Sequence, residues 1–240
     1  MNIKQIGHAI VHLDKSNEDY LIPLPRVKVS GLITGTPYPE LTGSYEIISS
    51  TGYLSEVDFS GKKLLGMSGE KNHVHAAVFG PNDSKRKNPI YEVEGAWNQK
   101  FVFKDVVNKR NLEVFDTNAQ TPAPLKVAPT QEQDPWESRR AWAGVIDALE
   151  HGDMQRTSDA KSKIEQAQRE WRKKEEAEGR PWQPKFFVRS RTDEIFERLA
   201  SASSAGQHSD DAAYGFWKFD TQKAARAQRP FHGDAKPDVA

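Results

Sequence analysis

The segment 53–59 reads Tyr53-Leu54-Ser55-Glu56-Val57-Asp58-Phe59 and alternates apolar with polar residues. A period of two gives a β-strand one buried face and one wet face, which is typical of antiparallel sheets. Similar short segments, separated by Gly, Pro, Asn and Asp, lie at residues 26–33, 44–48, 73–79, 90–94 and 101–103. Strands at this spacing predict that residues 1–116 form an antiparallel sandwich or barrel.

The chain changes character after residue 116. Residues 117–130 contain prolines and show no periodicity, so we expect an extended crossing segment there. The sequence Asp134-Pro135-Trp136-Glu137 then offers an N-cap, a proline for the first turn and an acidic residue. It predicts a helix that begins at Asp134 and ends at Gly152. Its apolar face is expected to hold Trp142, Val145, Ile146 and Leu149.

A second, longer helix is expected from Asp153 to Glu178. This segment is rich in Lys, Glu, Gln and Ala, and Gly179 directly after it provides a C-terminal stop. We therefore expect residues 117–225 to form a crossing segment and a helical subdomain of the same domain. Residues 226–240 are expected to be a disordered tail. The predicted fold class is mainly β with C-terminal α-helices.

Composition limits the functions that this chain can have. Its 240 residues suffice for one large domain or two small ones, and 34 basic residues balance 34 acidic ones. Any phosphate binding must then come from a local cluster of charge. The absence of cysteine excludes disulfides and Cys-ligated zinc. Residues 1–13 do not resemble a signal peptide, and no apolar run has membrane-spanning length. We expect a cytoplasmic protein that is peripheral on membranes.

Three charged residues of the second helix form a regular row. Lys161, Glu165 and Arg169 are spaced i, i+4 and i+8, so they share one helix face, about 130° away from the apolar stripe. The ordinary interpretation is a solvated ladder of ion pairs, and spacing alone favours it. The functional interpretation is a row of donors for an anionic head group, in which Glu165 holds the two cations apart.

No motif in the chain supports catalysis. His73 and His75 point to the same face of an expected strand and could form half of a metal site, but no third ligand is evident. A solvent-facing pair is the better interpretation, and a metal-dependent cupin enzyme is only a distant alternative. Neither a Gly-rich phosphate loop nor a Gly-x-Ser-x-Gly motif is present. We predict a protein that is not an enzyme and needs no metal or cofactor.

Several motifs resemble those of one family. In the C-terminal half these are Pro124-Leu125-Lys126-Val127, Gln133-Asp134-Pro135-Trp136-Glu137-Ser138-Arg139, residues 161–176 and Trp182-Gln183-Pro184-Lys185-Phe186-Phe187. Upstream, Ser49-Ser50-Thr51-Gly52, Phe59-Ser60-Gly61-Lys62 and Gly95-Ala96-Trp97 follow in the expected order. On these motifs the chain resembles oxysterol-binding proteins over residues 3–190 and looks closest to short fungal members.

The resemblance implies a function as well as a fold. The family fold is a nearly complete antiparallel β-barrel that encloses a lipid tunnel beneath a lid. Its members bind a sterol, another lipid or phosphatidylinositol 4-phosphate and exchange them between membranes. Lys161, Glu165 and Arg169 match the residues that meet the inositol phosphate at the tunnel mouth, and Lys4 is a further candidate. The expected function is therefore non-vesicular lipid transfer, with sterol and phosphoinositide as ligands and the membrane surface as partner.

One family motif is missing from the chain. The run Glu-Gln-x-Ser-His-His-Pro-Pro is absent, and the resemblance places it upstream of Met1 together with the lid and the first strands. We therefore expect an incomplete barrel with an unpaired edge and an exposed apolar face. Such a chain should self-associate or need a second piece. The alternative function is a truncated remnant that transfers no lipid and acts as an interaction or regulatory piece.

Overall fold

The computed structural model describes residues 2–32, 35–60, 71–180, 182–204, 208 and 213–228. The chain divides into two compact units. The sheet unit comprises Met1–Pro122 and Arg189–Trp217, and the helical unit comprises Ala123–Val188 and Lys218–Ala240. Most of the tail expected at residues 226–240 lies outside the described residues.

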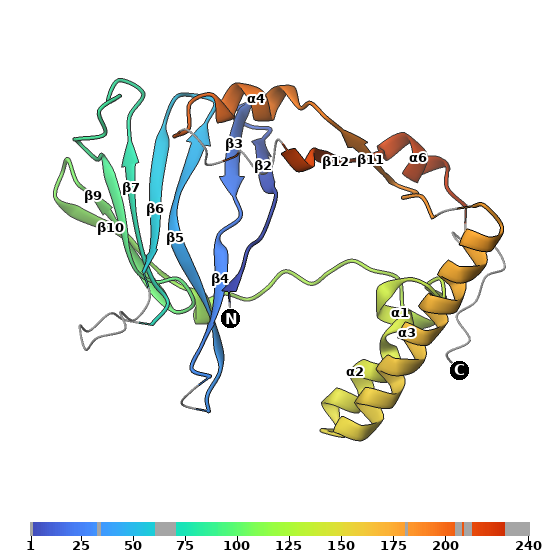
Figure 1. Ribbon diagram of the computed structural model, residues 1–240. Coiled ribbons are helices and arrows are strands. Elements are labelled where there is room, and N and C mark those ends of the chain that lie inside the picture. The colour runs from blue at the N-terminus through green and yellow to red at the C-terminus, as the bar shows by residue number, and fades with distance from the viewer. Residues whose placement is uncertain are drawn as a thin grey trace. The chain divides into compact units, whose positions relative to one another are not determined.

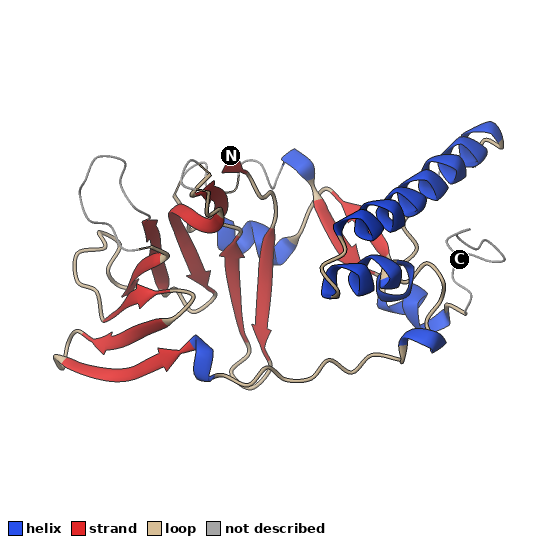
Figure 2. Ribbon diagram, turned by 90° about the horizontal axis from the view of Figure 1, so that it is seen from below, coloured by secondary structure: helices blue, strands red, loops and turns tan. Residues whose placement is uncertain are grey.

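The sheet unit is an open, curved antiparallel sheet (Figures 1 and 2). Its strands are β1 (Asn2–Ile3), β2 (His8–Leu13), β3 (Glu18–Pro23), β4 (Arg26–Ser30), β5 (Tyr38–Ser49), β6 (Leu54–Ser60), β7 (His73–Phe79), β8 (Tyr91–Ala96), β9 (Lys100–Asp105) and β10 (Arg110–Asp116). The strand order is β1-β4-β5-β6-β7-β8-β9-β10, and the β2–β3 hairpin joins through β5. Within the described residues β1 and β10 do not pair with each other, so the expected incomplete barrel is confirmed.

The core of this unit lies where the hairpin meets the long strand β5. Leu21 on β3 and Ile48 on β5 lie opposite each other and are almost completely buried. Helix α4 (Glu194–Ala200) adds Phe196 and Leu199, and Phe216 completes the cluster. Each such side chain contributes about 1.5–3 kcal/mol when it is fully buried. Helix α4 and Phe216 are therefore fixed to the sheet by apolar packing.

The first expected helix begins later in the chain than the sequence predicts. After the 3-10 turns η1 (Thr117–Ala119) and η2 (Thr130–Glu132), helix α1 (Ser138–Ala141) begins at Ser138 and not at Asp134. The Asp134 carboxylate accepts the Trp136 amide, while Glu137 accepts the Asp134 amide. These bonds close a separate turn before the helix, and Glu137 has extended backbone angles.

Helix α2 (Ala143–Glu150) follows after a break at Trp142. It buries Val145 and Ala148, whereas Ile146 and Leu149 are about half exposed. The expected apolar face is thus only partly right, because Val145 is buried as expected but the other buried position is Ala148.

The second expected helix is confirmed as α3 (Met154–Ala177). The Asp153 side chain caps it by accepting the Arg156 amide at 2.9 Å, and Gly179 follows at φ +65°. A positive φ is favourable for glycine, which explains why the helix ends there. The chain continues into β11 (Phe187–Ser190), which pairs with β12 (Phe216–Phe219) in a two-stranded sheet, and α6 (Thr221–Arg226) comes last.

Candidate functional site

The charged row predicted on the second helix is present on one face of α3. The Lys161 Nζ atom lies 2.5 Å from Glu165 Oε1, and Arg169 Nη1 lies 4.0 Å from Glu165 Oε2. All three side chains are about half exposed. The hydrogen bond from Lys161, strengthened by its charge, lowers the pKa of Glu165 below its ordinary value. One carboxylate therefore holds two cations one helical turn to either side of it, and the row keeps a net positive charge.

The row lies on a different side of α3 from the groove between α2 and α3. That groove has a volume of about 420 Å³ and is lined from α3 by Arg156, Lys163 and Ile164. A ligand that meets the row would therefore do so from the open side of the helix. Lys4, the fourth predicted residue, belongs to the sheet unit.

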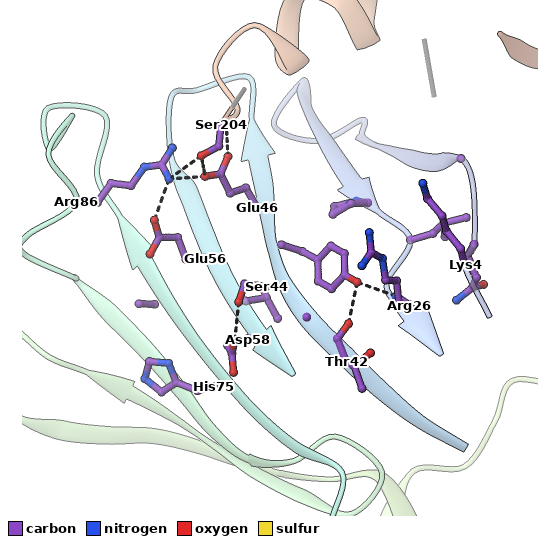
Figure 3. Close-up of a pocket in the computed structure, with 18 residues that line it drawn as sticks. Lys4, Arg26, Thr42, Ser44, Glu46, Glu56, Asp58, His75, Arg86 and Ser204 are labelled. Carbon is purple, nitrogen blue, oxygen red and sulfur yellow. Dashed lines mark hydrogen bonds and ion pairs between the residues drawn. The ribbon is translucent and has the colours of Figure 1, made fainter. Parts of the chain in front are cut away.

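Lys4 lines a polar pocket of about 800 Å³ in the sheet unit (Figure 3). One wall consists of side chains from β5, β6 and β7, and the opposite wall is formed by segments 4–7 and 23–26. Its charged lining residues are Lys4, Arg26, Glu46, Glu56, Asp58 and Arg86. Cations and carboxylates thus line one hollow together, which suits the polar end of a ligand better than a wholly apolar molecule.

An ion cluster closes one end of this pocket. Arg86 pairs with the buried Glu46 and also with Glu56, the latter at 2.8 Å. Ser204, in the segment after α4, donates both its amide, at 2.6 Å, and its hydroxyl to Glu46. Figure 3 shows the four side chains converging from β5, β6 and two loops.

The cluster also sets the charge state of its central carboxylate. Burial would raise the pKa of Glu46, but the Ser204 hydroxyl and amide and the Arg86 guanidinium outweigh it and hold the pKa below its ordinary value. Sequence patterns did not indicate this cluster, because Glu46 is 40 residues from Arg86 and 158 residues from Ser204.

Polar side chains continue along the pocket wall. The Ser44 hydroxyl donates to Asp58 at 2.6 Å, and His75 lies opposite Asp58 on the neighbouring strand. His75 thus faces the pocket rather than open solvent. Among the described residues, no group of three or more His, Asp or Glu side chains is arranged to hold a metal ion.

No helix in the described part of the chain combines the length and apolarity needed to cross a bilayer.

Comparison with known proteins gives close relatives. A probable transporter of Hormonema carpetanum, efuK, is 54% identical over 240 residues, which are 99% of this chain and 34% of that protein. The kes1 protein of Schizosaccharomyces pombe is 38% identical over 222 residues, which are 91% of this chain and 55% of its own length. The chain thus spans between a third and about half of these two relatives.

Solved structures share the fold at low sequence identity. The Osh1 ORD domain in complex with cholesterol superposes with a TM-score of 0.55 and 18% identity, over 90% of this chain and 52% of that one. The Osh3 ORD in complex with PI(4)P from Saccharomyces cerevisiae superposes with a TM-score of 0.52 and 20% identity, over 75% of this chain and 49% of that one. A model of the oxysterol-binding protein family matches residues 1–145 and 146–227. The chain therefore belongs to the oxysterol-binding protein family.

Proposed function

We propose that this chain binds a membrane lipid and contributes to non-vesicular transfer of sterol and phosphatidylinositol 4-phosphate between membranes. The observation that carries the proposal is the family match over residues 1–227. Two structural neighbours support it, because one holds cholesterol and the other PI(4)P. We place the protein on the cytoplasmic side, where it meets membranes peripherally.

Transfer of this kind needs no covalent chemistry, so no catalytic residue is proposed. A sterol has about 27 carbons, and at about 0.8 kcal/mol per buried CH₂ its bare transfer to water costs roughly 20 kcal/mol. A protein that replaces the lost apolar contacts removes most of this barrier. Exchange between two membranes then depends only on which lipid occupies the site at each of them.

In this proposal the α3 row binds the phosphorylated head group. Lys161 and Arg169 donate to phosphate oxygens, and Glu165 keeps the two cations at their spacing. Charge-assisted hydrogen bonds of this kind contribute about 1.5–3 kcal/mol each. Lys4 belongs to the sheet unit and is a separate candidate cation, on the wall of the polar pocket.

The direct test is transfer between liposomes by the 240-residue protein. We expect it to accelerate movement of a fluorescent sterol from donor to acceptor vesicles, and to move phosphatidylinositol 4-phosphate in the opposite direction. The alternative is a remnant that keeps the C-terminal helices and serves as an interaction or regulatory piece. Normal folding without binding of either lipid would favour that alternative and reject the transfer proposal.

Self-association through the open sheet edge is a further expectation. Strand β10 pairs only with β9 in the described sheet, and its Leu112 and Val114 side chains are about half exposed. An unpaired apolar edge readily accepts another strand. Sizing chromatography with light scattering should therefore give a mass above 27.1 kDa that falls on dilution. A sharp monomer peak with cooperative melting would contradict this expectation.

A further inference from the structure

The helical unit exposes a group of large aromatic side chains, here called the aromatic patch, which consists of Trp182, Phe187 and Phe219. Their exposed fractions are 59%, 48% and 54%. Trp182 and Phe187 line one apolar groove of about 420 Å³, and the Phe187 and Phe219 rings meet edge to face at 5.4 Å. The three rings are therefore continuous. Exposed rings that gather in this way usually mark a surface that contacts another protein or a membrane.

Basic residues outnumber acidic ones in the two segments that carry the aromatic patch. Residues 180–188 and 218–226 of the helical unit contain five basic residues and one acidic residue, although the whole chain has no net charge. The five are Arg180, Lys185, Lys218, Lys223 and Arg226. Lys185 lines the same groove as Trp182. The one acidic residue, Asp220, lies 3.9 Å from Lys223 and caps α6.

Two carboxylates, Asp134 and Glu137, also line the groove. Asp134 accepts the Trp136 amide at 3.0 Å, and Glu137 accepts the Asp134 amide at 2.9 Å. Glu178, just before the basic segment, pairs with Arg180. With these carboxylates and Asp220 counted, five basic residues stand against four acidic ones, so the surface combines aromatic rings with a small excess of positive charge.

This combination fits one kind of partner, a bilayer that contains anionic lipids. A Trp ring such as that of Trp182 favours the zone between lipid head groups and acyl chains, with its N–H in the wet part, and the two Phe rings add apolar surface that this zone can bury. Basic side chains near an anionic surface add about 1 kcal/mol each. From this geometry we infer that the aromatic patch docks the protein on anionic membranes. The inference rests on the proposed function, since a lipid carrier must reach the bilayer surface.

Vesicle flotation tests the inference with phosphatidylcholine vesicles that either contain or lack phosphatidylserine. We expect the protein to bind the anionic vesicles more tightly and to lose this preference in high salt. Trp182→Ala and Phe219→Ala should each weaken binding about tenfold. Tyr53→Ala is the matched control, because it removes an aromatic ring that is 43% exposed in the sheet unit.

A charge variant keeps the test decisive if an aromatic variant does not fold. Lys185→Glu changes one exposed side chain and should weaken binding to anionic vesicles about tenfold without affecting neutral ones. Lys15→Glu, in the β2–β3 turn, is its control and should have little effect. Equal binding by the patch variants and their controls would overturn the inference. So would a loss that tracks protein self-association on sizing columns, because the patch would then contact a second copy.

The same samples separate this inference from the proposed function. Sterol and phosphatidylinositol 4-phosphate binding are measured in parallel, with ligand supplied from a soluble carrier. Loss of flotation with intact ligand binding in the patch variants supports docking. If the unmodified protein floats through the patch but binds neither lipid, the docking inference stands and the transfer proposal fails.

Discussion

Replacing Arg86 with methionine is expected to lower the free energy of unfolding by about 3 kcal/mol. Methionine keeps an unbranched stem but removes the cation that faces Glu46, whose side chain is only 8% exposed. Removal of one partner from a buried ion pair costs about 3–5 kcal/mol, because the other charge is left uncompensated. The value should lie at the lower end, since Arg86 is itself 27% exposed and the Ser204 bonds to Glu46 remain.

Urea unfolding of the full chain measures this effect. Lys85→Met is the matched control, because Lys85 is an exposed cation on the same loop, and its replacement should change the free energy by less than about 0.5 kcal/mol. The double variant Glu46→Gln with Arg86→Met leaves no unpaired buried charge, since Glu56 is 46% exposed, and should regain part of the loss. Similar stabilities for Arg86→Met and Lys85→Met would show that the cluster does not hold the sheet unit together.

The unmodified protein and the Arg86→Met variant should differ less in their free energy of unfolding at acidic pH. Because the folded-state pKa of Glu46 is held below its ordinary value of 4.5, the unfolded chain binds more protons in the acid range and stability rises with pH there. The contribution of the cluster is complete above about pH 4.5 and is lost as the pH falls through the lower folded-state pKa. Unfolding curves at neutral and acidic pH check this convergence.

The sequence predicted strands well where burial alternates along them. Residues 73–79 were expected as a strand and form β7, in which Val74 and Ala76 are buried between less buried neighbours. The hairpin β2–β3 was not anticipated, although Asn17 at its turn has φ +53°, a conformation that asparagine tolerates. Most of β2 faces solvent, so Ile10-Val11 gives no clear alternation. Edge and hairpin strands are therefore the ones that periodicity misses.

The candidate site also has one part that the sequence could predict and one part that it could not. The α3 row could be predicted because its contacts are local, and a helix brings residues four apart together whatever surrounds it. The cluster of Glu46, Arg86 and Ser204 depends on the pairing of β5 with β6 and on the docking of α4. Its members come from three distant segments, so only the folded chain assembles them.

Alanine substitution at the two ends of the α3 row should separate the two ligands of the proposed function. Lys161→Ala and Arg169→Ala are each expected to weaken binding of phosphatidylinositol 4-phosphate by about 10- to 100-fold, since each removes a charge-assisted contact of about 1.5–3 kcal/mol. Sterol carries no phosphate, so sterol loading should persist. Fluorescent-sterol binding and phosphoinositide extraction from liposomes measure the two effects on the same protein.

Lys163→Ala provides the matched control, because it removes the same charge from the same helix about 200° around from Lys161, where the side chain faces the α2–α3 groove. It should leave phosphoinositide extraction within about twofold, since it removes no proposed head-group contact. Glu165→Gln should cost less than loss of either cation, because it removes only the group that spaces them. If sterol and phosphoinositide binding fell equally in Lys161→Ala and Arg169→Ala, the row would support the helix fold and not the head group. If Lys163→Ala weakened phosphoinositide extraction as much, the effect would come from the overall positive charge of α3. Only a specific contact distinguishes one face of the helix from another.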